Sequence, residues 1–391
     1  MKFDVVIIGA GPAGLSFARS LADTNLNIAI IEKQTRQALI NPLYDGRDIA
    51  LTHHSVKLLN ELDAWQHIPA IDISPIKEAR VLDGVSPYYL HFDHRKVCND
   101  ALGYLVSNHL IRKSLYEEVS LLSNVTLFAE TVVNGVSVDN VSASVFLSNG
   151  ESLDASLLVA ADSRFSETRR MAGLSADMLD FGQTVIVCRM SHEKPHLNIA
   201  HECFHYGRTL AVLPLNGNKS SIVITAPTDL AKDIIDMSEE VFNKDITYQF
   251  NNKLGKMKLI SERHAYPLVA VHAKKFYSNR FALIGDAAVG MHPVTAHGFN
   301  LGVRGQNILA REIKSAIKNR ADIGAASVLE KYHAKHRKLT RPLYLGTNSI
   351  VKLFNDNKLP ARIARKSILR LSNHIWPIKR AIMNQLTAIE N

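Results

Sequence analysis

Cysteine is scarce in this sequence: Cys98, Cys188 and Cys203 are the only three in 391 residues, and no two of them form a Cys-x-x-Cys pair. An odd number without that spacing argues against a disulfide framework and indicates structural thiols in a reducing compartment. The chain also lacks an apolar run near the ~18 residues of a membrane-spanning helix, and its first residues show no signal peptide. We therefore expect a cytoplasmic protein without a spanning helix.

Acidic residues are nearly absent from the C-terminal region. Residues 331–391 contain 13 basic residues (Lys and Arg) but only 2 acidic residues (Asp and Glu). The other 330 residues contain 33 basic and 35 acidic residues. The basic excess behind the net charge of +9 therefore lies in this tail. Because a nucleic-acid-binding protein is typically basic over its binding domain, we expect no nucleic acid partner. The length is enough for two or three domains.

A glycine-rich turn follows the first predicted strand, an apolar run over residues 4–8. The turn contains three glycines in the G-x-G-x-x-G spacing, Gly9, Gly11 and Gly14. Residues 15–22 then predict a helix, residues 27–31 predict a second strand, and Glu32 ends it. This is the βαβ dinucleotide fingerprint, in which the pyrophosphate lies at the helix N-terminus and the acid binds the adenosine ribose. The motif alone fits NAD and FAD equally.

Two later apolar strands also end in an acid. Residues 157–161 lead into Asp162, and residues 281–285 lead into Asp286, which precedes a loop and a helix predicted over residues 299–317. Carboxylates at the carboxyl ends of parallel strands lie where open α/β sheets bind ligands. They accept hydrogen bonds from hydroxyls such as those of a flavin ribityl chain, so the late acid favours FAD.

In this order, the motifs resemble those of the FAD-dependent aromatic hydroxylases, and most closely those of the ubiquinone-biosynthesis hydroxylases. Residues 162–169 resemble the second motif of these enzymes, because Asp162, Ser166 and Arg169 match it. Residues 285–302 resemble the third motif, and residues 46–51 resemble the R-x-I-A-L segment of the same family. The resemblance covers about residues 1–345. It implies these FAD-binding residues: Gly9, Gly11, Gly14, Glu32, Arg47, Asn108, Asp162, Asp286, Pro293, Gly298 and Asn300.

The sequence departs from the family pattern around the flavin-facing loop. Ser163 replaces a glycine, Val289 a histidine and Gly305 an aspartate, and His297 lies in the loop where the family has Ala-Gly-Gln-Gly. His297 is either close to the flavin, where it would tune the ring as the one candidate catalytic residue, or a solvated loop histidine.

The resemblance also implies the chemistry. NAD(P)H would reduce FAD, O₂ would add to it, and the flavin C4a-hydroperoxide would hydroxylate a lipophilic phenol or quinol, a polyprenylated ubiquinone precursor. No second G-x-G-x-x-G is present, so we expect no separate nicotinamide domain. Two alternatives stay open: a flavoprotein reductase of isoprenoid double bonds, and a non-catalytic FAD-binding accessory protein of a biosynthetic complex.

Other histidines have simpler interpretations. His201 and His205 share one face of a predicted strand, but a metal site needs a third ligand and none is evident, so we expect no metal. His333 and His336 lie in a Lys-rich helical stretch, which predicts a solvated face.

The predicted fold is α/β (α+β overall), with a glutathione-reductase-like FAD-binding domain around a parallel sheet, a β-sheet substrate domain and a C-terminal helical segment. We expect residues 1–75, 101–180 and 262–345 in the FAD-binding domain and residues 76–100 and 181–261 in the substrate domain. Residues 346–391 form the basic tail, whose apolar positions over residues 360–389 recur at helical spacing. Such a helix either docks on an anionic membrane surface or a biosynthetic complex, which would make the protein peripheral to the inner face of the membrane, or packs on the enzyme body.

Overall fold

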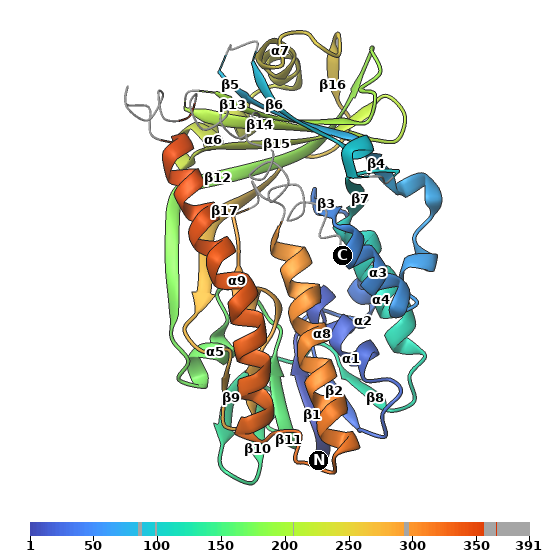
Figure 1. Cartoon of the computed structure of the whole chain (residues 1–391), viewed down its shortest axis with the longest axis vertical. Coiled ribbons are helices and arrows are strands. Elements are labelled where there is room, and N and C mark those ends of the chain that lie inside the picture. The colour runs from blue at the N-terminus through green and yellow to red at the C-terminus, as the bar shows by residue number, and fades with distance from the viewer. Residues whose placement is uncertain (85–87, 98–99, 206, 293–296, 356–364, 366–391) are drawn as a thin grey trace.

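The computed structural model describes residues 1–84, 88–97, 100–205, 207–292, 297–355 and 365. Two large sheets lie toward opposite ends of an elongated molecule, α8 (His297–Lys318) runs alongside the first sheet, and α9 (Ala326–Asn355) extends from the first sheet to the second (Figure 1). None of the helices in this described part of the chain combines the length and hydrophobicity that a bilayer-crossing segment needs. The predicted amphipathic helix over residues 360–389 falls outside it, apart from residue 365.

The first sheet has eight strands in the order β18-β19-β11-β1-β2-β8, with β10 and β9 attached to β11. Strands β19, β11, β1, β2 and β8 run parallel, as the βαβ fingerprint predicts. The central β1 and β2 are apolar and buried because helices cover the sheet, with α1 (Pro12–Ser20) packed on α4 (Asn108–Ser120) and α8. The other strands are β8 (Val125–Phe128), β9 (Val133–Val138), β10 (Ala143–Leu147), β11 (Ser152–Ala160), β18 (Tyr277–Ser278), β19 (Phe281–Leu283), β1 (Lys2–Ile8) and β2 (Ile28–Ile31).

The second sheet has nine strands in the order β20-β17-β12-β15-β14-β13-β5-β6, with β16 attached to β12. Its outer face carries α6 (Thr228–Asp236) and α7 (Glu239–Gln249), whose apolar side chains form one core with the strands. The inner face is turned toward the first sheet (Figure 1). The strands are β5 (Glu78–Asp83), β6 (Tyr89–Asp93), β12 (Ala176–His192), β13 (Ile199–His205), β14 (Arg208–Leu215), β15 (Lys219–Pro227), β16 (Met257–Leu259), β17 (His264–Ala273) and β20 (Val289–Gly290).

A small antiparallel sheet of β3 (Asp48–Leu51), β7 (Gly103–Ser107) and β4 (Ser74–Ile76) lies between the two large sheets. The short helices are α2 (Arg36–Ile40), α3 (His53–Glu61) and α5 (Glu167–Met171). Apolar residues of β4 and β7 pack against the inner face of the nine-stranded sheet. This sheet therefore joins the two halves of the molecule.

The fold class is confirmed: the protein is α/β with a parallel sheet, a second β-rich unit and a helical C-terminal segment. The division into domains stays a prediction, although some elements do not follow its boundaries. β17 pairs with β12 in the nine-stranded sheet, although residues 262–345 were expected with the FAD-binding domain. The helix α9 crosses residue 346, where the tail was expected to begin, without interruption.

The predicted solvated face around His333 and His336 is wrong. The side chain of His336 is 1% exposed, and its ring stacks on Tyr332 with centroids 5.7 Å apart. His333 accepts a hydrogen bond at Nδ1 from the backbone N–H of Phe276. Burial is the main cause that lowers the pKa of His336 to about 3, so the imidazole is neutral.

Candidate functional site

Three predicted signatures meet because their strands are adjacent in the eight-stranded sheet. Ile8 of β1 pairs with Ala160 of β11, and Ala160 pairs with Leu283 of β19. The turns that follow these three residues therefore lie side by side at the carboxyl edge of the sheet, where ligands of such sheets bind. Segments up to 275 positions apart in sequence thus build one site.

The glycine turn after β1 forms an open cradle. Gly9 has a φ of +109°, and a Cβ there would lie 2.6 Å from the carbonyl oxygen of Ala161. A Cβ on Gly14 would lie 2.0 Å from the carbonyl oxygen of Gly9, so this glycine permits close packing of helix on strand. A Cβ on Gly11 would meet no atom within 4 Å. Two of the glycines therefore shape the turn, and the third keeps space free beside it.

The N-terminus of α1 faces this cradle without a capping side chain. Gly11 is its N-cap residue and Pro12 occupies the first turn. Backbone N–H groups at an uncapped helix N-terminus, together with the helix dipole, bind phosphate groups. The turn thus fits the pyrophosphate of a dinucleotide, as predicted.

Glu32 is held at the same edge by backbone donors. Its Oε2 accepts a hydrogen bond from the N–H of Ala10 at 2.8 Å, and its Oε1 accepts one from the N–H of Gln34 at 2.9 Å. Each carboxylate oxygen has a further lone pair, so the fixed carboxylate can also accept from ribose hydroxyls. The predicted role of Glu32 in binding the adenosine ribose agrees with this geometry and stays a prediction.

The late acidic turn packs directly on the glycine turn. Gly285 has a φ of +59°, and a Cβ there would lie 2.8 Å from the Cβ of Ala13. The side chain of Asp286 is 38% exposed, and its Oδ2 accepts a hydrogen bond from Nη2 of Arg164 at 3.0 Å. Sequence reasoning did not single out Arg164, although it stands two residues after Asp162. The carboxylate is therefore oriented by an arginine and remains accessible to a ligand.

Residues of the second signature fix the third signature in place. Arg169 is 2% exposed, and it donates from Nη1 to the carbonyl of Ala287 at 2.9 Å and from Nη2 to the carbonyl of Arg164 at 3.2 Å. Ser166 caps α5 by accepting from the N–H of Arg169. The predicted ligand Asp162 accepts a hydrogen bond from Thr168 at 3.2 Å. Arg169 therefore links the two acidic turns.

Arg47 and Asn108, both predicted to bind FAD, are joined by Asp45, which sequence reasoning missed. Arg47 donates from Nε to Oδ2 of Asp45 at 3.0 Å, and Nδ2 of Asn108 donates to the same oxygen at 2.8 Å. Tyr266 of β17 donates to the backbone carbonyl of Asp45 at 2.6 Å. The side chain of Arg47 is 46% exposed, so it can still reach an anionic ligand. No periodicity marks Asp45, because it lies in a segment outside helices and strands.

The helix α8 begins next to the predicted flavin-facing loop. Asn300 is buried: its Nδ2 donates to the carbonyl of Ala50 at 2.9 Å, and its Oδ1 accepts from the hydroxyl of Ser55 at 2.6 Å. Its side chain therefore ties α8 to β3 and α3. Gly298 lies in the first turn of the helix, and a Cβ there would meet no atom within 4 Å. Pro293 lies outside the described residues.

His297, the first residue of α8, is 7% exposed, so the alternative of a solvated loop histidine is wrong. Burial lowers its pKa to about 4. The ring is therefore neutral at physiological pH, and it can donate or accept a hydrogen bond without carrying a charge. A role of His297 beside the flavin stays a prediction.

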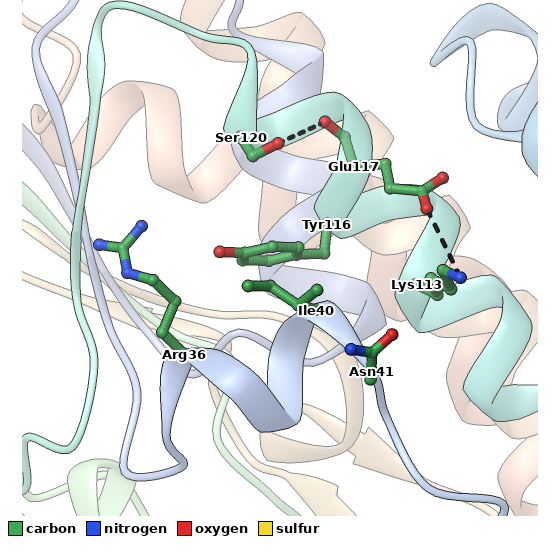
Figure 2. Close-up of a pocket in the computed structure, with 7 residues that line it drawn as sticks. All are labelled: Arg36, Ile40, Asn41, Lys113, Tyr116, Glu117 and Ser120. Atoms are coloured by element: carbon green, nitrogen blue, oxygen red, sulfur yellow. Dashed lines mark hydrogen bonds and ion pairs between the residues drawn. The ribbon is translucent and has the colours of Figure 1, made fainter.

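A surface groove between α2 and α4 takes no part in this edge of the sheet (Figure 2). The ring of Tyr116 points toward Arg36 across it, and Lys113 pairs with Glu117 at 3.9 Å on its rim. Its lining residues are Arg36, Ile40, Asn41, Lys113, Tyr116, Glu117 and Ser120.

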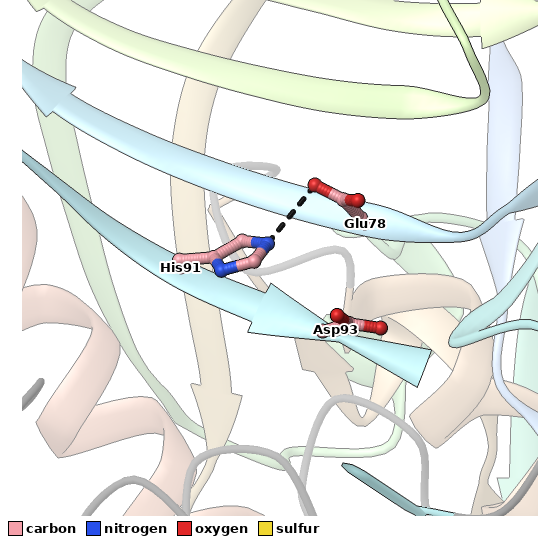
Figure 3. A group of neighbouring side chains, drawn as sticks. All are labelled: Glu78, His91 and Asp93. Atoms are coloured by element: carbon pink, nitrogen blue, oxygen red, sulfur yellow. Dashed lines mark hydrogen bonds and ion pairs between the residues drawn. The ribbon is translucent and has the colours of Figure 1, made fainter. Parts of the chain in front are cut away.

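Three potential metal ligands, Glu78, His91 and Asp93, gather where β5 pairs with β6 (Figure 3). Arg80 donates to Glu78 at 2.8 Å, and Arg95 donates to both carboxylate oxygens of Asp93, which holds the pKa of Asp93 well below its usual range. These arginines already neutralise both carboxylates. We therefore interpret the group as an ion-pair network.

Comparison with known proteins identifies a family model, described as an FAD binding domain, that matches residues 2–344. The chain is 49% identical over 388 residues to ubiquinone hydroxylase UbiM of Neisseria meningitidis. The aligned region covers 98% of this chain and 84% of that protein. It is 33% identical over 380 residues to ubiquinone hydroxylase UbiL of Rhodospirillum rubrum, with coverages of 97% and 88%.

Among solved structures, p-nitrophenol 4-monooxygenase PnpA of Pseudomonas putida superposes with a TM-score of 0.79 at 18% identity, covering 99% of this chain and 98% of that one. PqsL of Pseudomonas aeruginosa, a probable FAD-dependent monooxygenase, superposes with a TM-score of 0.75 at 16% identity, covering 91% and 97%. At these identities the likeness establishes the fold.

Proposed function

The chain belongs to the FAD binding domain family and, within it, to the ubiquinone-biosynthesis hydroxylases, and from this membership we propose that it hydroxylates the ring of a polyprenylated phenol or quinol on the route to ubiquinone. It is an FAD-dependent aromatic monooxygenase. The names of its relatives support the substrate class.

The convergence of the three strand ends at Ile8, Ala160 and Leu283 is the observation that carries this proposal. The glycine turn and Glu32 would hold the adenosine and pyrophosphate end of FAD, and Asp286 would hold the ribityl end. Bound FAD supplies the chemistry, which is reduction by NAD(P)H and activation of O₂. The chain supplies binding, orientation and exclusion of water.

The N-terminus of α8 would stabilise negative charge on the reduced cofactor. Its first backbone N–H groups have no partner within the helix, and the dipole places positive charge there. The dipole contributes about 0.3–2 kcal/mol, so direct N–H hydrogen bonds must add to it. The imidazole of His297 is neutral and adds no charge of its own at this position.

Turnover with labelled oxygen tests the proposal. Purified yellow protein is supplied with NADH or NADPH, a short-chain prenylated phenol and ¹⁸O₂, and the products are analysed by mass spectrometry. We expect a hydroxylated ring that carries ¹⁸O, and no product without the reductant. A saturated isoprenoid chain would instead support the reductase alternative, and no turnover with any quinone precursor would support the accessory protein.

Arg365 of the basic tail contacts the enzyme body. Nε of Arg365 lies 3.9 Å from Oδ1 of Asp83 at the end of β5, and the two side chains are 1% and 2% exposed. We propose that Arg365 anchors the tail on the nine-stranded sheet, and that other basic residues recruit the protein to an anionic membrane surface on its cytoplasmic side. Full-length protein should float with anionic liposomes at low salt, whereas Lys379→Glu/Arg380→Glu protein should float less. Equal flotation of both proteins would contradict the recruitment.

A further inference from the structure

The carboxylate of Glu202 interrupts the apolar inner face of the nine-stranded sheet. Glu202 lies in β13 between Ala200 and Phe204, which point to the same face because side chains alternate along a strand. Both neighbours belong to the apolar cluster on the inner face, whereas His201 packs on Phe250 of the opposite face. Glu202 therefore points inward, toward the FAD-binding half of the molecule.

The residues beside Glu202 on adjacent strands are apolar as well. Glu202 pairs with Val81 of β5 and with Ala211 of β14. The same row continues through Leu90 on one side and Val223 on the other. Cross-strand neighbours on one face lie within contact distance. The carboxylate is therefore surrounded by hydrocarbon along its strand and across the sheet.

Nothing within the described part of the chain pairs with this carboxylate: it has no hydrogen bond and no ion pair there. Burial raises its pKa to about 8, which is the effect of an apolar environment on a carboxyl group. The side chain nevertheless keeps a minor exposed fraction. A buried polar group without a partner costs stability, and a ligand hydroxyl would complete its hydrogen bonds.

Other charged groups on this face of the sheet form ion pairs that do not include Glu202. The Asp83–Arg365 ion pair lies farther along β5, and Arg189 is paired with Asp48 of β3. The pKa of Glu202 responds to none of these charges. Tyr44, Tyr88, His264 and Tyr266 are further titratable residues on this side.

Resting on the proposed function, we propose that Glu202 binds the ring hydroxyl of the aromatic substrate and thereby orients the ring against the apolar inner face of the sheet. A phenol is an apolar body with one hydroxyl, and Glu202 offers one carboxyl without a partner in the described part of the chain, among apolar neighbours. In its protonated form the carboxyl donates and accepts, and in its ionised form it accepts, so both forms bind a hydroxyl. An apolar site without this residue would bind the hydrocarbon but would not select the hydroxyl.

Binding of matched probes tests this assignment. Ortho-prenylphenol and its O-methyl ether are titrated into FAD-loaded enzyme, and the flavin absorbance change gives each dissociation constant. We expect the wild type to prefer the phenol by about tenfold or more, because a site built for a hydroxyl leaves its polar group unpaired when the hydroxyl is blocked. Glu202→Leu should reduce the preference to near unity, and Glu202→Gln should keep part of it. Glu240→Gln, on the exposed surface of α7, is the matched control and should keep the wild-type ratio.

The outcomes separate this assignment from the proposed function, because the binding ratio does not depend on turnover. A wild-type ratio in Glu202→Leu protein that retains its FAD would overturn the role of Glu202. If that variant loses FAD or fails to fold, the nearly isosteric Glu202→Gln decides: an unchanged ratio overturns the role, and a reduced ratio supports it. A wild-type enzyme that shows the preference but forms no hydroxylated product would contradict the proposed function and leave the role of Glu202 standing.

Discussion

Arg164 donates a hydrogen bond from Nη2 to Oδ2 of Asp286 at 3.0 Å, which links the second signature to the third. Asp286→Ala should weaken FAD binding by about tenfold or more, since it removes a charged acceptor of cofactor hydroxyls. Arg164→Met should weaken it less, because the carboxylate remains but loses its orientation. FAD titration of the apoprotein measures both constants. Asp229→Ala, on the exposed surface of α6, is the control, and wild-type affinity in Asp286→Ala would refute the assignment.

Two glycines of the first turn should respond differently to the same substitution. A Cβ on Gly14 would lie 2.0 Å from the backbone of Gly9, whereas one on Gly11 would meet no atom within 4 Å. Gly14→Ala should therefore disrupt the fold, while Gly11→Ala should keep the apoprotein stability and weaken FAD binding by filling the cradle. Thermal unfolding of the apoproteins and FAD titration distinguish the two effects. A Gly11→Ala protein with unchanged affinity would show that the pyrophosphate does not bind there.

Gly305 of α8 accommodates the ring of His336 from α9. A Cβ on Gly305 would lie 2.7 Å from Nε2 of His336. Alanine normally stabilises a helix interior by about 1 kcal/mol relative to glycine, but here the overlap should make Gly305→Ala destabilising by about 1–3 kcal/mol. The substitution should be tolerated better in a His336→Ala background. Denaturant unfolding of the four proteins gives the coupling energy, and additive effects would contradict the contact.

The free energy of unfolding should depend on Glu202 in a defined pH range. Burial raises its folded-state pKa to about 8 from the ordinary value of 4.5. Between these values the unfolded chain has lost a proton that the folded chain keeps, so stability falls as pH rises. Glu202→Gln should remove this fall, and the variant should gain stability over the wild type from about pH 5 to about pH 8. If the denaturation midpoints of the wild type and Glu202→Gln changed with pH in the same way across this range, Glu202 would not be buried.

His297 should influence the flavin as a neutral dipole. Because burial lowers its pKa to about 4, its protonation state does not change near neutrality. His297→Ala should therefore shift the flavin midpoint potential by a constant amount between about pH 6 and pH 8, without changing its pH slope. Spectroelectrochemistry of both proteins measures this. A different slope in the variant would indicate a titrating imidazole, and identical potentials would place His297 away from the ring.

Local patterns predicted the elements that carry the cofactor site. The run over residues 4–8, the glycines and Glu32 specify a strand, a turn and a second strand by themselves, and the helix predicted over residues 299–317 is α8. The pairing of Arg164 with Asp286 depends on strands β11 and β19 becoming neighbours, and no local signal in either segment encodes that order. No local signal shows that β17 pairs with β12 either, which explains why its residues were expected in the FAD-binding domain.

The sequence contains a pattern that predicts the burial of His336, but polar residues within the pattern made it hard to recognise. Tyr332, His336 and Thr340 repeat every four residues and are all buried. This is the spacing of a core-facing helix stripe, but it contains a histidine and a threonine within a Lys-rich stretch. Glu202 was missed for a related reason, since attention to His201 and His205 obscured the one acid on the opposite face of β13.

The position of β19 beside β11 determines when the holoenzyme can form during biosynthesis. β11 is complete at residue 160, but the strand that covers its C-terminal half begins at residue 281. A nascent or prematurely terminated chain that stops before that strand has an open parallel edge and lacks the late acid. Such fragments are prone to aggregation rather than cofactor uptake. We therefore expect FAD to bind only after the chain has been synthesised past Asp286.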